Sequence, residues 1–225
     1  MIDKKATQIS ELEKNTVEAA ISKAEKNTSA EIFAVLAQRS DDYRFIAYGI
    51  LALWIFIVSG LLAVYLEWQS VIGWGDVDAL AKVPVSYFLW AQLLAFLCGI
   101  ALLKYVPSLV KMLVPERIAH ERAHANAVKQ FLAHGIHHTD KRTGVLIFIS
   151  LQEQYGEIIV DRLIEEKIGR DYFLENVEIM LAQCELGNIG KAFEITIGEI
   201  GNKLANDFPR SQNDRNELAD KLIVM

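Results

Sequence analysis

The pentapeptide His120-Glu121-Arg122-Ala123-His124 has the residue types and spacing of the helical signature with which zinc peptidases bind their metal. On a helix, His120 and His124 lie one turn apart on the same face, so both imidazoles can ligate one ion. Glu121 can then act as the general base toward a zinc-bound water. The first function hypothesis is therefore a zinc metallopeptidase with His120 and His124 as metal ligands and Glu121 as the catalytic residue.

A catalytic zinc site needs a third protein ligand, and the sequence does not select one. All five histidines lie within nineteen residues, but His134 stands about 15 Å from His124 along a continuous helix, whereas zinc to nitrogen distances are about 2 Å. Glu175 and Glu178, on a later helix, remain conceivable ligands. Arg122 is unfavourable beside a divalent cation unless it points away. We therefore favour a second interpretation, a solvated and weakly basic helix near a membrane surface.

A second group of candidate metal-binding residues lies around an expected strand hairpin. Glu153, Glu157 and Asp161 bracket this hairpin, and their carboxylates could gather calcium or magnesium, which prefer oxygen ligands. The alternative, which we favour, is that they are exposed polar ends of strands. Cys98 and Cys184 show neither metal nor redox spacing. The sequence therefore supports no cofactor strongly and leaves zinc and calcium as alternatives.

Composition and charge restrict the class of protein. The formal net charge is -6, and the acidic excess is spread along the chain, so no basic stripe is present to neutralise a phosphate backbone. Nucleic acid is excluded as an expected partner. The chain is 52% hydrophobic with a mean hydropathy of +0.20, which indicates a protein with both membrane and soluble parts.

Two long apolar segments predict transmembrane helices at residues 45–66 and 85–106. Phe45–Leu66 is an uncharged run of 22 residues and Val85–Leu103 is one of 19, and a helix of about 20 residues crosses a bilayer. Residues 67–84 are expected to form a short loop with a single lysine, whereas lysine and arginine are more frequent on the other side of the two segments. By the positive-inside rule, both termini are cytoplasmic.

An α/β pattern surrounds these two segments. The first helix and strand, about forty residues, are too few to bury a core alone, so they must pair with the strands beyond the apolar segments. One cytoplasmic domain interrupted by a membrane hairpin is therefore expected. The expected elements are a helix at 10–27 with a capping box at Ser10 and Glu13, strands at 30–37, 144–151 and 157–161, and helices at 171–186 and 189–208.

One part of the chain resembles a known family. The run from Arg142-Thr143-Gly144 through the apolar strand to Tyr155, Glu157 and Asp161 resembles the TPM domain family, known from thylakoid-lumen phosphatase-like proteins. More closely, the chain is similar to a bacterial membrane-protein branch in which two membrane spans interrupt the domain. The resemblance covers roughly residues 10–40 and 116–222. It implies a mixed-sheet α/β sandwich, and it also implies weak phosphatase activity or calcium binding as alternative functions.

These observations predict an integral protein of the bacterial inner membrane. Its cytoplasmic domain is expected to be TPM-like and to act as a binding or scaffold module, with the lipid bilayer and a protein as partners. Whether the chain is an enzyme is left open. The expected organisation is a helix and strand at 1–40, transmembrane helix 1 at 45–66, a non-cytoplasmic loop at 67–84, transmembrane helix 2 at 85–106, a juxtamembrane helix and the remaining domain at 107–208, and a tail at 209–225.

Overall fold

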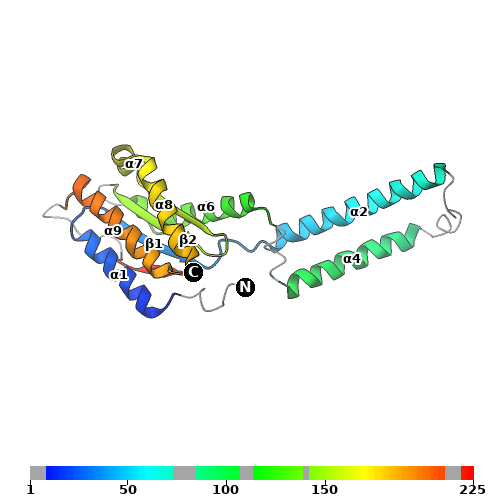
Figure 1. Ribbon diagram of the computed structural model, residues 1–225, viewed down its shortest axis with the longest axis horizontal. Helices are drawn as coiled ribbons and strands as arrows, with labels where there is room; N and C mark the ends of the chain where they lie inside the picture. The colour runs from blue at the N-terminus through cyan, green and yellow to red at the C-terminus, as the bar shows by residue number, and fades with distance from the viewer. Residues whose placement is uncertain (1–8, 73–84, 107–113, 139–141, 211–218) are drawn as a thin grey trace. The chain divides into compact units, whose positions relative to one another are not determined.

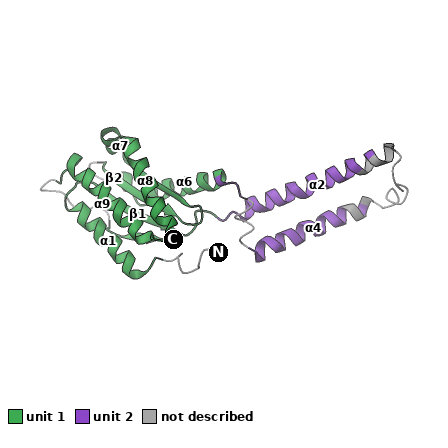
Figure 2. Ribbon diagram, viewed as in Figure 1, with its two compact units in different colours: residues 1–41, 117–225 green, residues 42–116 purple. Residues whose placement is uncertain are grey.

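The chain divides into two compact units. The computed structural model describes residues 9–72, 85–106, 114–138, 142–210 and 219–225. Unit 1 comprises residues 1–41 and 117–225, and unit 2 comprises residues 42–116 (Figure 2). Unit 1 contains helices and a four-stranded mixed sheet, which confirms the predicted mixed α/β class.

The sheet of unit 1 has the strand order β3-β2-β1-β4 (Figure 1). β1 runs parallel to both β2 and β4, and β2 runs antiparallel to β3. The first three strands confirm the predicted ones to within two residues, whereas β4 lies in the segment interpreted as a tail. The strands are β1 (Glu31–Ala37), β2 (Gly144–Ser150), β3 (Tyr155–Val160) and β4 (Leu222–Val224).

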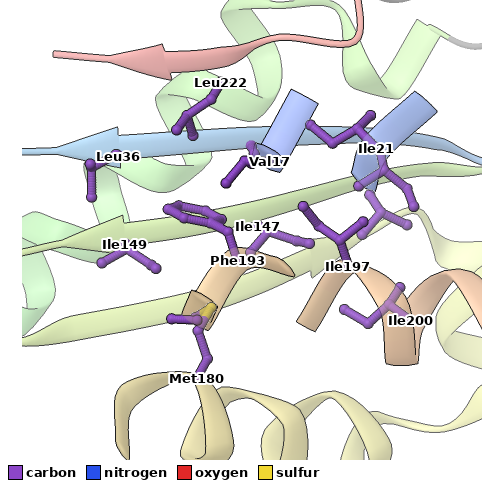
Figure 3. Close-up of a cluster of buried hydrophobic side chains, with 14 of the residues drawn as sticks. Val17, Ile21, Leu36, Ile147, Ile149, Met180, Phe193, Ile197, Ile200 and Leu222 are labelled. Atoms are coloured by element: carbon purple, nitrogen blue, oxygen red, sulfur yellow. The ribbon is translucent and has the colours of Figure 1, made fainter. Parts of the chain in front are cut away.

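Both faces of the sheet are covered, and β1 and β2 are buried along their whole length, which explains why they are mostly apolar. One face packs against α1 (Glu11–Glu25), α8 (Arg170–Glu185) and α9 (Ile189–Asp207), and Figure 3 shows how Val17, Met180, Phe193 and Leu222 fill this core. The other face packs against α6 (Glu116–Ala133) and η2 (Ile136–His138). A short helix that the sequence did not predict, α7 (Arg162–Ile168), follows β3.

The predicted capping box at the start of α1 is present. The Glu13 backbone N–H donates to the Ser10 hydroxyl at 3.2 Å, and the Ser10 backbone N–H donates to the Glu13 carboxylate at 2.9 Å. These two bonds satisfy backbone groups that a helix leaves unpaired at its first turn. The sequence therefore located the beginning of this helix correctly.

The described part of unit 2 contains two long apolar helices, α2 (Arg44–Ile72) and α4 (Val85–Tyr105), which pack against each other. Among the described residues, Arg44–Tyr65 is the one stretch that is long and apolar enough to cross a membrane. The apolar part of α4, Leu89–Tyr105, is shorter. The structure therefore offers one candidate span where the sequence predicted two. The loop predicted at residues 67–84 is partly helical, because α2 extends to Ile72. The rest of that predicted loop, residues 73–84, lies outside the described ranges.

Candidate functional site

Hydroxyl and carboxylate groups meet where the parallel strands β1 and β2 end. The Ser40 and Ser150 hydroxyl oxygens lie 2.8 Å apart, and the Ser150 hydroxyl donates to the carboxylate of Glu153. The Ser40 backbone N–H donates to the other oxygen of this carboxylate at 3.2 Å. Glu153 is only 7% exposed. It therefore joins the chain after β1 to the turn between β2 and β3, and both of its oxygens already accept hydrogen bonds.

A second polar group lies beside the first, on the face of the sheet that α6 covers. His124 Nδ1 lies 2.9 Å from both carboxylate oxygens of Glu157, and the Tyr155 hydroxyl donates to the same carboxylate at 3.0 Å. Tyr155 is paired across the hairpin with Ser150, which places the two groups next to each other. Burial, reinforced by the charge of Glu157, raises the pKa of Tyr155, so its phenol remains a hydrogen-bond donor at neutral pH.

The arrangement can bind polar ligands and move protons. An imidazole whose Nδ1 is held by a carboxylate has a fixed orientation, and its Nε2 is left to accept or donate a proton. The His124 side chain is 56% exposed, and that of Glu157 is 22% exposed, so a dissolved ligand can reach the pair. In open α/β sheets, ligands bind at the carboxyl ends of the parallel strands, and the Ser40, Ser150 and Glu153 group lies at this edge.

The peptidase signature forms a helix as predicted, but its side chains are engaged elsewhere. The His120 ring lies 5.3 Å from that of Tyr155. Glu121 pairs with Arg117 at 3.1 Å, and both side chains are exposed. Arg122 pairs with Asp41 at 3.4 Å and so connects α6 to the segment that follows β1. The candidate base Glu121 therefore forms an ion pair within its own helix.

The proposed third zinc ligands do not converge on His120 and His124. Among the described residues, no group of three or more histidine, cysteine, aspartate or glutamate side chains could hold a metal ion. Glu175 and Glu178 belong to α8, which covers the face of the sheet opposite α6. The His134 ring instead lies 4.6 Å from that of Phe33.

This geometry leads to a prediction for metal content. We expect the purified full chain to contain far less than one zinc ion per molecule, and His124→Ala to leave that content unchanged. Elemental analysis after dialysis against zinc at neutral pH measures both quantities. One zinc per chain that disappears in His124→Ala would establish a zinc site and overturn this expectation.

The three carboxylates considered for calcium do not lie together. Glu153 lies beyond the C-terminal end of β2, three residues after Ser150. Asp161 lies at the opposite end of this strand, where it accepts a hydrogen bond at 3.1 Å from the backbone N–H of Gly144, the first residue of β2. Glu157 lies between them on β3, four residues before Asp161, or about 13 Å along an extended strand. One ion cannot be held by ligands this far apart, because calcium to oxygen distances are about 2.4 Å.

Sequence reasoning missed a buried acid, Glu25. Its side chain is 9% exposed, and one carboxylate oxygen accepts a hydrogen bond from the Ile32 backbone N–H at 2.8 Å. Burial, with the nearby acids Glu31 and Asp220, raises the pKa of Glu25 to about 9. Its position carried a signal, because residue 25 continues the stripe of Val17 and Ile21 at intervals of four. An acid on such a stripe is expected to be buried.

The comparisons with known proteins support the fold of this chain. No family model and no curated protein matches it. The NMR structure of the BA42 protein from the psychrophilic bacterium Bizionia argentinensis is similar to this chain, with a TM-score of 0.56 and 16% sequence identity. The match covers 96% of this chain and 95% of that one. At this identity, the likeness supports the α/β fold alone.

Proposed function

We propose that this chain is an integral membrane protein whose α/β unit is a cytoplasmic, TPM-like binding module held at the bilayer by α2 and α4. A single observation carries the membrane part of the proposal: only 6% of the apolar stretch within Arg44–Tyr65 is buried. A core helix of a soluble protein would be covered by its own chain. Large apolar side chains along this stretch are exposed instead, among them Phe45, Leu53, Trp54, Phe56, Leu61, Val64 and Tyr65.

Lipid is the partner that such a surface requires. Soluble proteins rarely expose contiguous apolar patches larger than a few hundred Å², and the exposed side chains follow α2 over more than five turns. In a bilayer the same side chains are favourably solvated, and the helix satisfies its own backbone hydrogen bonds. The extent of the exposed apolar surface thus favours a membrane over an aqueous environment.

The pairing of β1 with β2 supports a second crossing. These strands precede and follow unit 2 in the chain, and they are in continuous parallel register from Glu31 with Gly144 to Ala37 with Ser150. Both ends of unit 2 must therefore be on the same side of a membrane, which requires an even number of crossings. If α2 crosses the bilayer, α4 is the described helix that brings the chain back.

The contact between α2 and α4 is suited to a pair of membrane helices. The Gln92 side-chain amide donates to the Ser59 hydroxyl at 2.5 Å, which satisfies two polar groups within apolar helices. A Cβ atom at Gly99 would stand 2.4 Å from a methyl group of Leu51, so the small residue permits the close approach of the two helices. Small residues and interhelical hydrogen bonds are both common where membrane helices associate.

The distribution of basic residues supports an orientation in which unit 1 is cytoplasmic. Arg39 and Arg44 precede the first apolar segment, and Lys104 and Lys111 follow the second, whereas residues 67–84 contain one lysine. Because basic residues are retained in the cytoplasm, unit 1 and both termini are proposed to be cytoplasmic, at a bacterial inner membrane. The polar group around His124 and Glu157 is then available to a cytoplasmic protein partner.

Labelling of single cysteines in intact cells tests the topology. In a Cys98→Ala/Cys184→Ala background, Ser70→Cys reports on the end of α2, and Glu178→Cys reports on an exposed position of α8. We expect a membrane-impermeant maleimide to label Ser70→Cys in intact cells, and to label Glu178→Cys only after lysis. Labelling of Glu178→Cys in intact cells, or protection of Ser70→Cys until lysis, would contradict the proposed orientation. Recovery of the protein in the soluble fraction would contradict the membrane assignment itself.

A further inference from the structure

A cavity of about 390 Å³ lies at the carboxyl end of β2, on the face of the sheet that α8 and α9 cover. Ile149 and Leu151 contribute from the end of β2, Leu181 and Cys184 contribute from α8, and Leu186 contributes from the link to α9. Cavities of a few hundred Å³ are the size that encloses small molecules. Its location is also the one expected, since ligands of open α/β sheets bind beyond the carboxyl ends of the parallel strands.

The cavity lies where α8 ends, next to a closely packed part of the same helix. Beside it, α8 and β3 are in close contact, because a Cβ atom at Gly156 would stand 2.7 Å from Met180 Cε and 3.1 Å from Leu181 Cδ2. α8 then ends at Glu185, and Gly187 has a φ of +79°, a left-handed conformation that other residues rarely adopt. The helix therefore ends at a defined point, and Leu186 and Gly187 of the link to α9 line the cavity.

The lining is mostly apolar, and the described residues that form it include no lysine, arginine or histidine. Glu185 is the one charged residue among the described residues that line the cavity, and Gln154 adds an amide group. Ser150 also lines it, but its hydroxyl already donates to Glu153. Burial raises the pKa of Cys184 to about 11, so its thiol is neutral at neutral pH and behaves as part of the apolar wall. An anionic ligand would meet Glu185 with no cation to compensate, whereas an uncharged ligand would not.

The exposed side chain of Leu186 indicates that an apolar part of a ligand lies at the entrance of the cavity. Its side chain is 71% exposed, although it contributes to a cavity whose other walls include the buried Ile149. An apolar molecule in the cavity would cover Leu186 and remove its surface from water, which is favourable at about 25 cal/mol per Å². The cavity thus combines an apolar interior, an apolar entrance and the amide group of Gln154.

We propose that this cavity binds a small uncharged molecule with an aromatic or branched aliphatic body and a hydrogen-bonding group for Gln154. Indole is a suitable probe, because it is uncharged and aromatic and carries one N–H donor. Indole-3-acetate has the same ring system with a carboxylate, and so it tests whether the cavity excludes an anion. The proposal concerns unit 1 alone and does not depend on which side of a membrane this unit occupies.

Alkylation of Cys184 by iodoacetamide reports on the cavity in the full chain, reconstituted in lipid nanodiscs. We expect indole to slow this reaction several-fold and to saturate, because the ligand covers the thiol. Indole-3-acetate should bind about tenfold more weakly, equivalent to about 1.4 kcal/mol. Cys98, the other cysteine of the chain, lies in α4 outside the cavity. A thiol within a membrane helix is shielded from the reagent, so the reference is Glu178→Cys, an exposed position of α8 that does not line the cavity. Its alkylation rate should not change, and equal slowing at positions 178 and 184 would indicate a general effect of indole on the reagent or the bilayer.

A matched pair of variants in α8 separates cavity binding from surface binding. Leu181→Trp places a large ring in the cavity, whereas Leu174→Trp changes an exposed position of the same helix. Equilibrium dialysis of indole, which needs no reactive thiol, should give one saturable site in the wild type and in Leu174→Trp, and a loss of at least about tenfold in affinity in Leu181→Trp. Equal binding by all three proteins, or no saturable binding by the wild type, would overturn the proposal.

Discussion

Replacing Gly144 by alanine is expected to lower the free energy of unfolding of unit 1 by about 3 kcal/mol, the upper part of the range for overpacked cores. A Cβ atom at this position would stand 2.2 Å from the carbonyl oxygen of Ile136 and 2.5 Å from its Cγ2 atom. The nearest atom belongs to the backbone, so a change of rotamer cannot relieve the contact. The start of β2 or the segment η2 would have to move.

Movement at Gly144 would also disturb hydrogen bonds that hold three parts of the chain together. The Gly144 backbone N–H donates to the Asp161 carboxylate, and the Asp161 backbone N–H donates to the Gly144 carbonyl at 3.0 Å. Gly144 is also the partner of Glu31 at the start of the β1 and β2 pairing. A shift of the first residue of β2 therefore affects both the hairpin with β3 and the pairing with β1.

Gly198→Ala is the matched control for this substitution. Gly198 lies within α9, and a Cβ atom there would meet nothing within 4 Å. Alanine is favoured over glycine in a helix by about 1 kcal/mol, so this variant should be slightly more stable than the wild type. Urea unfolding of the full chain in detergent, followed by far-UV circular dichroism, measures both variants. A Gly144→Ala protein as stable as Gly198→Ala would show that the space at Gly144 is not restricted as described.

The elements that could be predicted from the sequence are those with a strong local pattern. The apolar runs of β1 and β2 and the stripe of α9 are long enough to identify a buried strand or an amphipathic helix, and the capping box located the start of α1. β4 is too short for such a pattern, since only Leu222–Val224 form it. Its strand conformation comes from pairing with Ala34–Leu36 of β1, nearly two hundred residues earlier in the sequence.

The candidate site could not be assembled from the sequence because its contacts join distant residues. The sequence marks His124 as a candidate zinc ligand and Glu157 as a candidate calcium ligand, but nothing in it indicates that the two side chains are in contact. Ser40 and Ser150 carry no sequence signal, since their hydroxyls meet only after β1 and β2 pair in register. Glu153 is a candidate cation ligand by its residue type, but in the structure it is a buried acceptor that joins the chain after β1 to the turn between β2 and β3.

Glu25 gives unit 1 a dependence on pH with a definite sign. Its pKa is raised from 4.5 to about 9 in the folded protein, first by burial and further by Glu31 and Asp220. The carboxylate oxygen that does not bond to Ile32 has no donor within reach among the described residues. A proton on Glu25 resolves this, because the protonated acid can donate to the Asp220 carboxyl group, with which it is in hydrogen-bonding contact.

The folded protein therefore holds a proton on Glu25 that the unfolded chain releases near pH 4.5. Below that pH both states are protonated, and the stabilising contribution is fully present. Between about pH 4.5 and pH 9 the folded state binds more protons than the unfolded state, so stability falls as the pH rises. At 1.36 kcal/mol per pH unit, the loss between pH 5 and pH 8 is up to about 4 kcal/mol.

Glu25→Gln is expected to remove this loss of stability at higher pH. The amide can accept from the Ile32 N–H and donate to Asp220, as the protonated acid does, but it does not titrate. Measured by urea unfolding, the variant should match the wild type at pH 5 and exceed its unfolding free energy by roughly 2–4 kcal/mol at pH 8. Glu11→Gln, an exposed position in the same helix, should show no such divergence. A constant difference between Glu25→Gln and the wild type across this range would mean that Glu25 is already ionised in the folded protein, and that a cation or a rearranged Asp220 stabilises its charge.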